Sequence, residues 1–165
     1  MSIQFSVKMN AKYMHDFYLY NTYTKISGIL VPVLGVAALG LAVHTCIQDG
    51  FIAAMPALLI AVILLVVNPM TTKTRAAMQV QNTPMFQKPL EYELDETGIT
   101  VRQDDVQATN KWEDIAKVVS TKKSILIYMN RVRAIILPKE CMGEQYDAVV
   151  EMLRANVPAK SMRMK

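Results

Sequence analysis

Two long uncharged runs dominate the pattern of polar and apolar positions along the chain. The first extends from Ile26 to Ile47 and the second from Phe51 to Val67. Because a helix needs roughly 20 apolar residues to cross a bilayer, both runs predict membrane-spanning helices. A buried helical hairpin in a soluble protein would need a large surrounding core, which a chain of 165 residues cannot build. We therefore expect a two-helix transmembrane hairpin over residues 26–67.

The sequence between the two runs is a tight polar turn, Gln48-Asp49-Gly50, which makes the helices antiparallel neighbours. Lysine and arginine residues that flank membrane spans collect on the cytoplasmic side. Here they lie before the first run and after the second: Lys8, Lys12, Lys25, Lys73, Arg75 and Lys88. Both termini are therefore expected to be cytoplasmic. No cleaved signal peptide is expected, because a polar and aromatic segment precedes the first run.

Small residues recur at helical spacing within both runs. They lie every seven residues in the first run and every four in the second: Gly28, Gly35 and Ala42, then Ala53, Ala57 and Ala61. Close backbone approach supplies the dispersion contacts that hold helices together in lipid. The two small faces are expected to meet within the hairpin, and a homodimer through these faces is the alternative. Neither run contains a charged residue that could carry ions or protons.

The segment before the first run alternates and then becomes aromatic. Alternation over residues 3–7, "IQFSV", predicts a half-buried strand. Asn10 is expected to cap a helix that extends toward the first span. Tyr18 and Tyr23 suit contact with the membrane surface, where a ring meets lipid and its hydroxyl meets water. Packing of these rings on the soluble part is the alternative. Residues 1–25 are thus predicted to form a strand and an interfacial helix.

The chain after the second run changes character. Residues 68–89 are polar and predict a short helix and a linker. Six short strands then follow, separated by turn-like residues: 90–94, 98–102, 106–112, 116–121, 124–129 and 133–138. One terminal helix presents an apolar face made of Tyr146, Val149, Val150 and Leu153.

Strand 3–7 brings the expected total to seven strands and a C-terminal helix. A small antiparallel barrel or sandwich, capped by the helix, accommodates this number of short strands. The predicted fold class is therefore α+β, with a cytoplasmic domain over residues 90–165. The membrane hairpin would be inserted after the first strand of that domain.

Two spans followed by "YELDETGITVR", "KWEDIAKVV" and "SILIYMNRVRAIILPKE" form a distinctive order. The most specific pieces are Trp112–Ile115, Tyr128 and Ile136–Lys139. This order resembles the YcxB-like family of small bacterial membrane proteins. The resemblance implies a pleckstrin-homology-like soluble part and a bacterial inner-membrane location, and it brings no catalytic residues.

The formal net charge of +4 adds a second feature. Lys122, Lys123, Arg131 and Arg133 flank the strand Ile125–Met129, and basic side chains are able to hold phosphate oxygens. Contact with the anionic inner leaflet is expected here, rather than a specific headgroup site.

Catalytic chemistry is not expected. The predicted soluble part has no histidine, its acidic residues lie mostly in turns, and its glycines are Gly98 and Gly143.

Cys46 and Cys141 would lie on opposite sides of the membrane, which excludes a disulfide between them. Trp112 is interpreted as a core residue, and an anchor at the membrane surface is the alternative. No enzyme activity, metal, cofactor or nucleic-acid partner is expected.

These patterns lead to one functional hypothesis and one alternative. The hypothesis is a non-enzymatic inner-membrane protein whose cytoplasmic domain binds a protein or peptide at the membrane surface, with a strand edge as acceptor. Its partners would be the lipid bilayer and a membrane or cytoplasmic protein. The alternative is an immunity or channel-blocking protein that acts through the hairpin.

Overall fold

A computed structural model describes residues 2–130 and 133–164 of the chain. The chain divides into two compact units. One, the sheet unit, comprises Met1–Phe17 and Ala77–Lys165, and the other, the hairpin unit, comprises Tyr18–Ala76. Two helices, α1 (Ala11–Tyr23) and α4 (Asn68–Asn82), have residues in both units.

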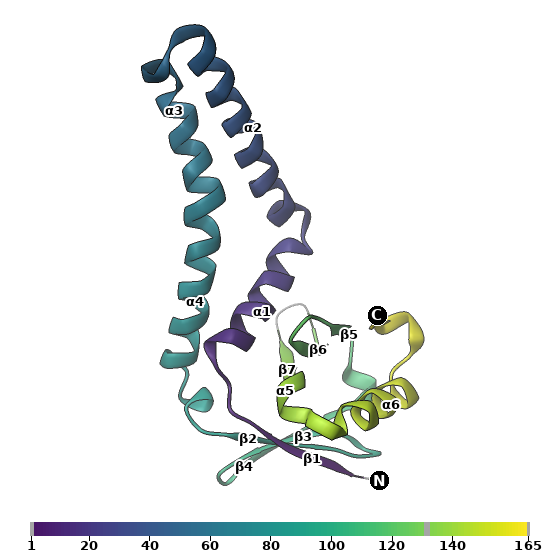
Figure 1. The fold of residues 1–165 in the computed structure, drawn as a ribbon. Helices are drawn as coiled ribbons and strands as arrows, with labels where there is room; N and C mark the ends of the chain where they lie inside the picture. Colours follow the sequence, from purple (N-terminus) through teal and green to yellow (C-terminus); the bar gives the residue numbers. More distant parts are fainter. Residues whose placement is uncertain (1, 131–132, 165) are drawn as a thin grey trace. The chain divides into compact units, whose positions relative to one another are not determined.

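The hairpin unit is built from two antiparallel helices, which Figure 1 shows side by side. The first is α2 (Ile26–Asp49). The second consists of α3 (Phe51–Val62), the π-helix η1 (Ile63–Val67) and α4 in one continuous run. Gly50 joins the two helices with φ 88°, a backbone conformation that glycine adopts without strain. Both helices are long and apolar enough to cross a membrane, and their most apolar 18-residue stretches have mean hydropathies of 2.1 and 2.7.

The second helix continues beyond its expected end at Val67. It extends to Asn82, and only then does the short 3-10 helix η2 (Pro84–Phe86) turn the chain toward the sheets. The π-helix has a physical cause in Pro69, which lacks an N–H and whose ring would collide with the carbonyl of Leu65 in a regular α-helix. A wider turn just before it relieves that crowding, and Asn68 N–H donates to the carbonyl of Ile63. We expected the second span to end at Val67 and a separate short helix to follow. The structure has a single long helix instead.

The sheet unit contains two four-stranded sheets. The first has the order β1 (Ile3–Val7), β2 (Leu90–Leu94), β3 (Gly98–Gln103) and β4 (Val106–Lys111), all antiparallel. The second has the order β7 (Ala134–Pro138), β6 (Ser124–Tyr128), β5 (Lys117–Ser120) and β8 (Met162–Arg163). The short helices η3 (Trp112–Asp114), α5 (Lys139–Met142), η4 (Gly143–Gln145) and η5 (Ala159–Ser161), and the longer α6 (Tyr146–Asn156), complete the unit.

The α+β class is confirmed. Of the two expected arrangements, a barrel or a sandwich, the closed barrel is wrong, because the strands form two separate sheets. The two sheets remain separate because η3 turns the chain between β4 and β5, while α5 contacts both β1 and β7 at the other junction. The second sheet is mixed, since β8 pairs parallel with β5. Two-residue β8 had no alternation that could have predicted it.

Strand β1 is an integral part of the first sheet. Ile3 pairs with Leu94 and Val7 with Leu90, so the apolar positions of both strands lie on one face. Ile3 and Val7 are buried, while Gln4 and Ser6 between them are exposed. The core joins this face to the second sheet and to α6, through residues such as Leu94, Ile99, Val118, Ile127, Leu137, Val149 and Leu153.

The start of α1 is fixed to the sheet unit by a cap and by Glu140. Asn10 Oδ1 accepts the N–H of Tyr13 at 3.1 Å, as an N-cap residue does. The hydroxyl of Tyr13 donates to Glu140 Oε2 at 2.9 Å, and Lys12 forms an ion pair with the same carboxylate. Burial, followed by the Glu140 hydrogen bond, raises the pKa of Tyr13 to about 12. The hydrogen bond from Lys12 is the main cause of a lowered pKa for Glu140.

The pairing of β1 predicts that its core residues stabilise the whole sheet unit. Val7→Ala should lower the free energy of unfolding by about 2 kcal/mol, because the fully buried side chain leaves a cavity. Trp112 is the single tryptophan of the chain, so its fluorescence during denaturation of the full chain in detergent reports on this unit. Ser6→Ala, on the exposed face of the same strand, should change the value by less than about 0.5 kcal/mol. Equal effects of the two substitutions would contradict the pairing.

Candidate interaction surface

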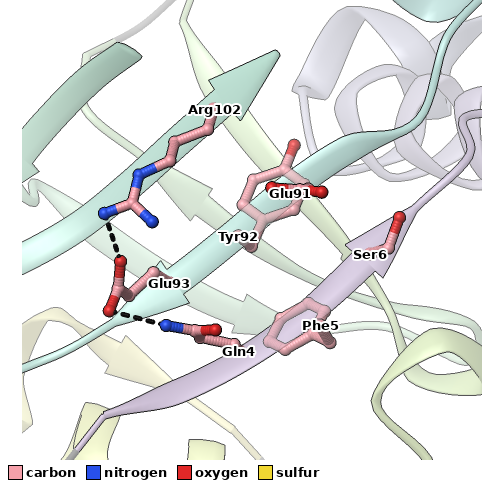
Figure 2. A pocket seen from close by; sticks show the side chains of 7 residues that line it. All are labelled: Gln4, Phe5, Ser6, Glu91, Tyr92, Glu93 and Arg102. Carbon is pink, nitrogen blue, oxygen red and sulfur yellow. Dashed lines mark hydrogen bonds and ion pairs between the residues drawn. The ribbon is translucent and has the colours of Figure 1, made fainter. Parts of the chain in front are cut away.

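The outer face of the first sheet carries a polar ladder that crosses all four strands. Gln4 of β1 donates to Glu93 of β2 at 2.8 Å, and the Arg102 guanidinium of β3 pairs with the same carboxylate at 2.6 Å (Figure 2). Arg102 Nε also donates to Gln107 of β4 at 3.3 Å. Cross-strand pairs of this kind add small increments to sheet stability. The ladder therefore ties β1 and β4, the two edge strands, to the centre of the sheet.

A shallow pocket of about 250 Å³ lies beside this ladder. Figure 2 shows the side chains that line it. Its lining consists of Gln4, Phe5, Ser6, Glu91, Tyr92, Glu93 and Arg102. The rings of Phe5 and Tyr92 stack with centroids 5.9 Å apart. Of its polar lining residues, Gln4, Glu93 and Arg102 are already paired with one another, so the pocket is interpreted as part of the sheet.

Strand β4 is the most exposed strand of the sheet unit. Its inward positions Val106 and Ala108 are exposed, although Val101, the β3 partner of Ala108, packs against the core. Val106 has 72% of its surface exposed. The outward positions Gln107, Thr109 and Lys111 are exposed as well. Both faces of β4 are thus open to solvent.

The register of the β3–β4 hairpin determines which backbone groups of β4 remain outside the sheet. Gln103 pairs with Val106 across the turn Asp104-Asp105, and a two-residue hairpin loop is closed by a hydrogen-bonded pair. Asp104 has φ 50°, which suits the first central residue of such a turn. Because hydrogen-bonded and non-hydrogen-bonded pairs alternate, the N–H and C=O groups of Gln107, Thr109 and Lys111 point away from β3. They form a free edge of donors and acceptors.

A second pocket lies at the end of β4, around Trp112. It has a volume of about 490 Å³ and is lined by Thr97, Lys111, Trp112, Glu113, Ile115, Asn156 and Pro158. Trp112 is buried, and its Nε1–H donates to the backbone carbonyl of Asp95 at 2.9 Å. The expectation that Trp112 packs in the core agrees with this position. An extended segment along β4 would reach this pocket at its end.

The β2–β3 turn beneath Trp112 is held by the Asp95 carboxylate. Its Oδ1 accepts the backbone N–H and the hydroxyl of Thr97, at 2.7 and 2.6 Å, and the N–H of Gly98 at 3.1 Å. The Thr97 hydroxyl is the largest cause of a lowered pKa for Asp95. Gly98 has φ 155°, and a Cβ placed there would lie 2.2 Å from the carbonyl oxygen of Asn110. Only glycine lets β3 and β4 approach this closely.

Lys122, Lys123 and Arg133, the described members of the basic group singled out in the sequence, lie beyond opposite ends of one strand. Lys122 and Lys123 lie in the turn before β6, whereas Arg133 lies just before β7, beyond the other end of β6. A strand of five residues separates these ends by roughly 17 Å. Arg131 lies outside the described residues. Lys122 and Arg133 are exposed and Lys123 is half-buried.

The residues expected to pack the hairpin are placed differently from one another. A Cβ on Gly35 would lie 2.7 Å from the Leu65 side chain, so this glycine permits a close approach of the second helix. Ala42 and Ala61 are buried and Ala57 is half-buried. Ala53, however, is exposed, and Ala54 is buried instead. A Cβ on Gly28 would meet Thr22, which precedes α2, and not the second helix.

The two tyrosines expected at the membrane surface both lie on the last part of α1. Tyr18 is half-buried, and Tyr23 has 42% of its surface exposed.

The described part of the chain, residues 2–130 and 133–164, shows no group of three or more His, Cys, Asp or Glu side chains able to hold a metal ion.

Sequence reasoning placed a strand at residues 106–112 but did not identify it as an open edge. A signal was present, because the inward positions Ala108 and Asn110 are small or polar. Core positions of a central strand are usually large and apolar.

The fold and its open edge define an α+β protein in which a long apolar hairpin interrupts a two-sheet domain after its first strand. The family model of YcxB-like proteins matches residues 94–153, so this part of the domain is YcxB-like. The resemblance stated from the sequence is thereby confirmed. No curated protein and no solved structure matches the chain.

The close approach at Gly98 predicts a sharp response to a small substitution. Gly98→Ala should lower the free energy of unfolding by about 2 kcal/mol or more, because the added Cβ meets backbone rather than a movable side chain. Chemical denaturation of the full chain, monitored by Trp112 fluorescence, measures this. Gly143→Ala is the comparison, since Gly143 has open space around it and only its backbone conformation, φ 52° and ψ −126°, disfavours a side chain, at about 1 to 3 kcal/mol. Gly98→Ala should cost more, because it adds a clash with backbone to its own unfavourable φ. A smaller loss for Gly98→Ala than for Gly143→Ala would contradict the geometry.

Proposed function

We propose that this chain is a non-enzymatic bacterial inner-membrane protein that holds a pleckstrin-homology-like domain at the cytoplasmic surface. The domain binds an extended segment of a protein along β4. The observation that carries this proposal is the open edge of β4, exposed on both faces and lined with outward backbone groups. Strand addition to such an edge is a recurring mode of peptide recognition.

Exposed apolar side chains on both long helices support insertion into a bilayer. Ile26 and Ile52 expose 87% and 88% of their surfaces, and most other large side chains of α2 and α3 are exposed too. A soluble protein rarely exposes continuous apolar surface of this extent. The 24 residues of α2 rise about 36 Å, which suffices for the hydrocarbon core of roughly 30 Å.

The order of elements supports the pleckstrin-homology-like assignment. A four-stranded antiparallel sheet is followed by three further antiparallel strands and then by the amphipathic helix α6. α6 buries Val149, Val150 and Leu153 against the core. Domains of this shape commonly serve as binding modules, and the family match covers the greater part of this domain.

The alternative is an immunity or channel-blocking protein that acts through its hairpin. It is less favoured, because Gly35, Ala42 and Ala61 are used in packing within the hairpin itself. The two proposals predict different effects of deleting residues 90–165 on the activity of the protein in cells. If removal of residues 90–165 left the activity of the protein in cells intact, binding along β4 would not be its function.

The proposed topology places Asp49 outside the cell and both termini inside. Cys46→Ser and Cys141→Ser first remove the native thiols. In that background, Asp49→Cys should react with an impermeant thiol reagent in intact cells, while Lys160→Cys should react only after the membrane is permeabilised. Labelling of Lys160→Cys in intact cells would overturn the assignment.

The proposed binding mode predicts that a proline on the edge prevents partner binding without unfolding the domain. Gln107→Pro removes an outward N–H but no hydrogen bond to β3, so the hairpin should remain. A photocrosslinking side chain at Lys111, in the full chain in intact membranes, should form protein adducts that fall at least about tenfold with Gln107→Pro, by loss of the added strand. Trp112 fluorescence checks that the domain is folded. The same side chain at exposed Lys160 is the positional control. Adducts insensitive to the proline would contradict binding at this edge.

A further inference from the structure

We propose that the segment that pairs with β4 is β4 of a second copy of this chain, in an antiparallel register centred on Ala108. This inference rests on the proposed function, since it names the partner of the same edge. Two copies related by a two-fold axis perpendicular to the sheet present the same face of β4 on the same side. The two sheets would then join into one continuous sheet of eight strands.

The outward backbone groups of β4 fit this arrangement. In the register centred on Ala108, Gln107 of one copy lies opposite Thr109 of the other, and the same pair occurs a second time by symmetry. Gln107 and Thr109 are the positions whose N–H and C=O groups point away from β3, so both pairs become hydrogen-bonded pairs. Ala108 then faces Ala108 of the second copy in a non-hydrogen-bonded pair. Such pairs bring Cα atoms to about 4.5 Å, and a methyl side chain fits this approach.

Charge selects this register over its neighbour. Centring on Ala108 brings Asp105 of each copy next to Lys111 of the other, which gives two attractive pairs. Centring on Thr109 also satisfies the backbone, but it brings Asp105 next to Glu113, and like charges directly opposite destabilise a sheet. Asp105, Lys111 and Glu113 are all exposed. Lys111 and Glu113 form an ion pair at 3.5 Å, but their side chains remain 70% and 74% exposed, so this weak pair leaves them free to reorient.

The inward face adds apolar contact to the polar edge. Val106 and Ala108 of both copies would form one strip on the same side of the joined sheet, next to the half-buried Val101 of each copy. Val106 is the large apolar side chain that the sheet unit leaves most exposed on its strands. Pairing of the two copies therefore covers apolar surface that the single copy leaves in water.

Membrane confinement makes so small an interface sufficient. A single pair of six-residue strands is only marginally stable in dilute solution. Two copies anchored in one membrane meet at a much higher effective concentration and with restricted orientation. The pairing should therefore be tested in the membrane with the full chain.

Cysteine crosslinking tests both the partner and the register. The background is Cys46→Ser/Cys141→Ser in the full chain, expressed in membranes and oxidised mildly. Ala108→Cys should form a disulfide-linked dimer, because the Cα atoms of this pair lie within the 4.4–6.8 Å that a disulfide requires. Thr109→Cys alone should give at least about fivefold less dimer, since two residues of offset exceed that reach. Thr109→Cys mixed with Gln107→Cys should restore crosslinking between the two variants.

A charge exchange tests the polar contact independently. Asp105→Lys should reduce the Ala108→Cys dimer several-fold, and Asp105→Lys/Lys111→Asp should restore it, because the pairs re-form with opposite polarity. Unchanged Trp112 fluorescence shows that each variant is folded. Crosslinking of Thr109→Cys alone that equals that of Ala108→Cys would overturn the register and with it the proposal. Adducts of Ala108→Cys with other proteins only would overturn self-pairing and leave the proposed function standing. Absence of any adduct at β4 would overturn both.

Discussion

The pairing of β1 with β2 is the interaction on which the rest of the structure depends. The chain leaves the first sheet at Val7 and returns to it at Leu90, and these two residues lie directly opposite each other. Everything between them must begin and end at neighbouring points of one sheet. A segment held in this way is able to cross a bilayer only an even number of times. The two apolar helices joined at Gly50 meet this condition, and a single span would break the sheet.

The strands were predictable from the sequence wherever one face of the strand is buried and the other is exposed to solvent. Ile3–Val7 and Leu90–Leu94 alternate strictly, and their register follows from that alternation. Two features had no such local signal. Strand β8 is a two-residue parallel pairing with β5, which depends on where α6 ends. The second helix continues past Val67 because a π-helical turn accommodates Pro69. A hydropathy profile cannot predict such a turn, because it contains no information on backbone geometry.

The candidate site was harder to predict than the fold, because exposure is a tertiary property. The sequence identified a strand at residues 106–112, but the openness of β4 depends on how far the second sheet and α6 extend over the first. The same limit applies in the hairpin, where Ala54 is buried rather than Ala53, because the spacing of small residues does not fix which side of a helix meets its neighbour. The basic residues around β6 are close in sequence, yet an extended strand separates its own ends. In each case the sequence showed the type of each residue. It did not show the residues that lie next to it in space.

The position of β1 also sets the order of events during synthesis. This strand is made before its partner β2, which follows only after about 80 further residues, and these take roughly 4 to 16 s to make. During that interval both apolar helices emerge, and in the proposed arrangement they enter the membrane before the sheet is able to close. The N-terminal strand waits unpaired, with its alternating polar residues keeping one face soluble. In the proposed arrangement, membrane insertion is thus an early step of biogenesis, and closure of the first sheet is a late one.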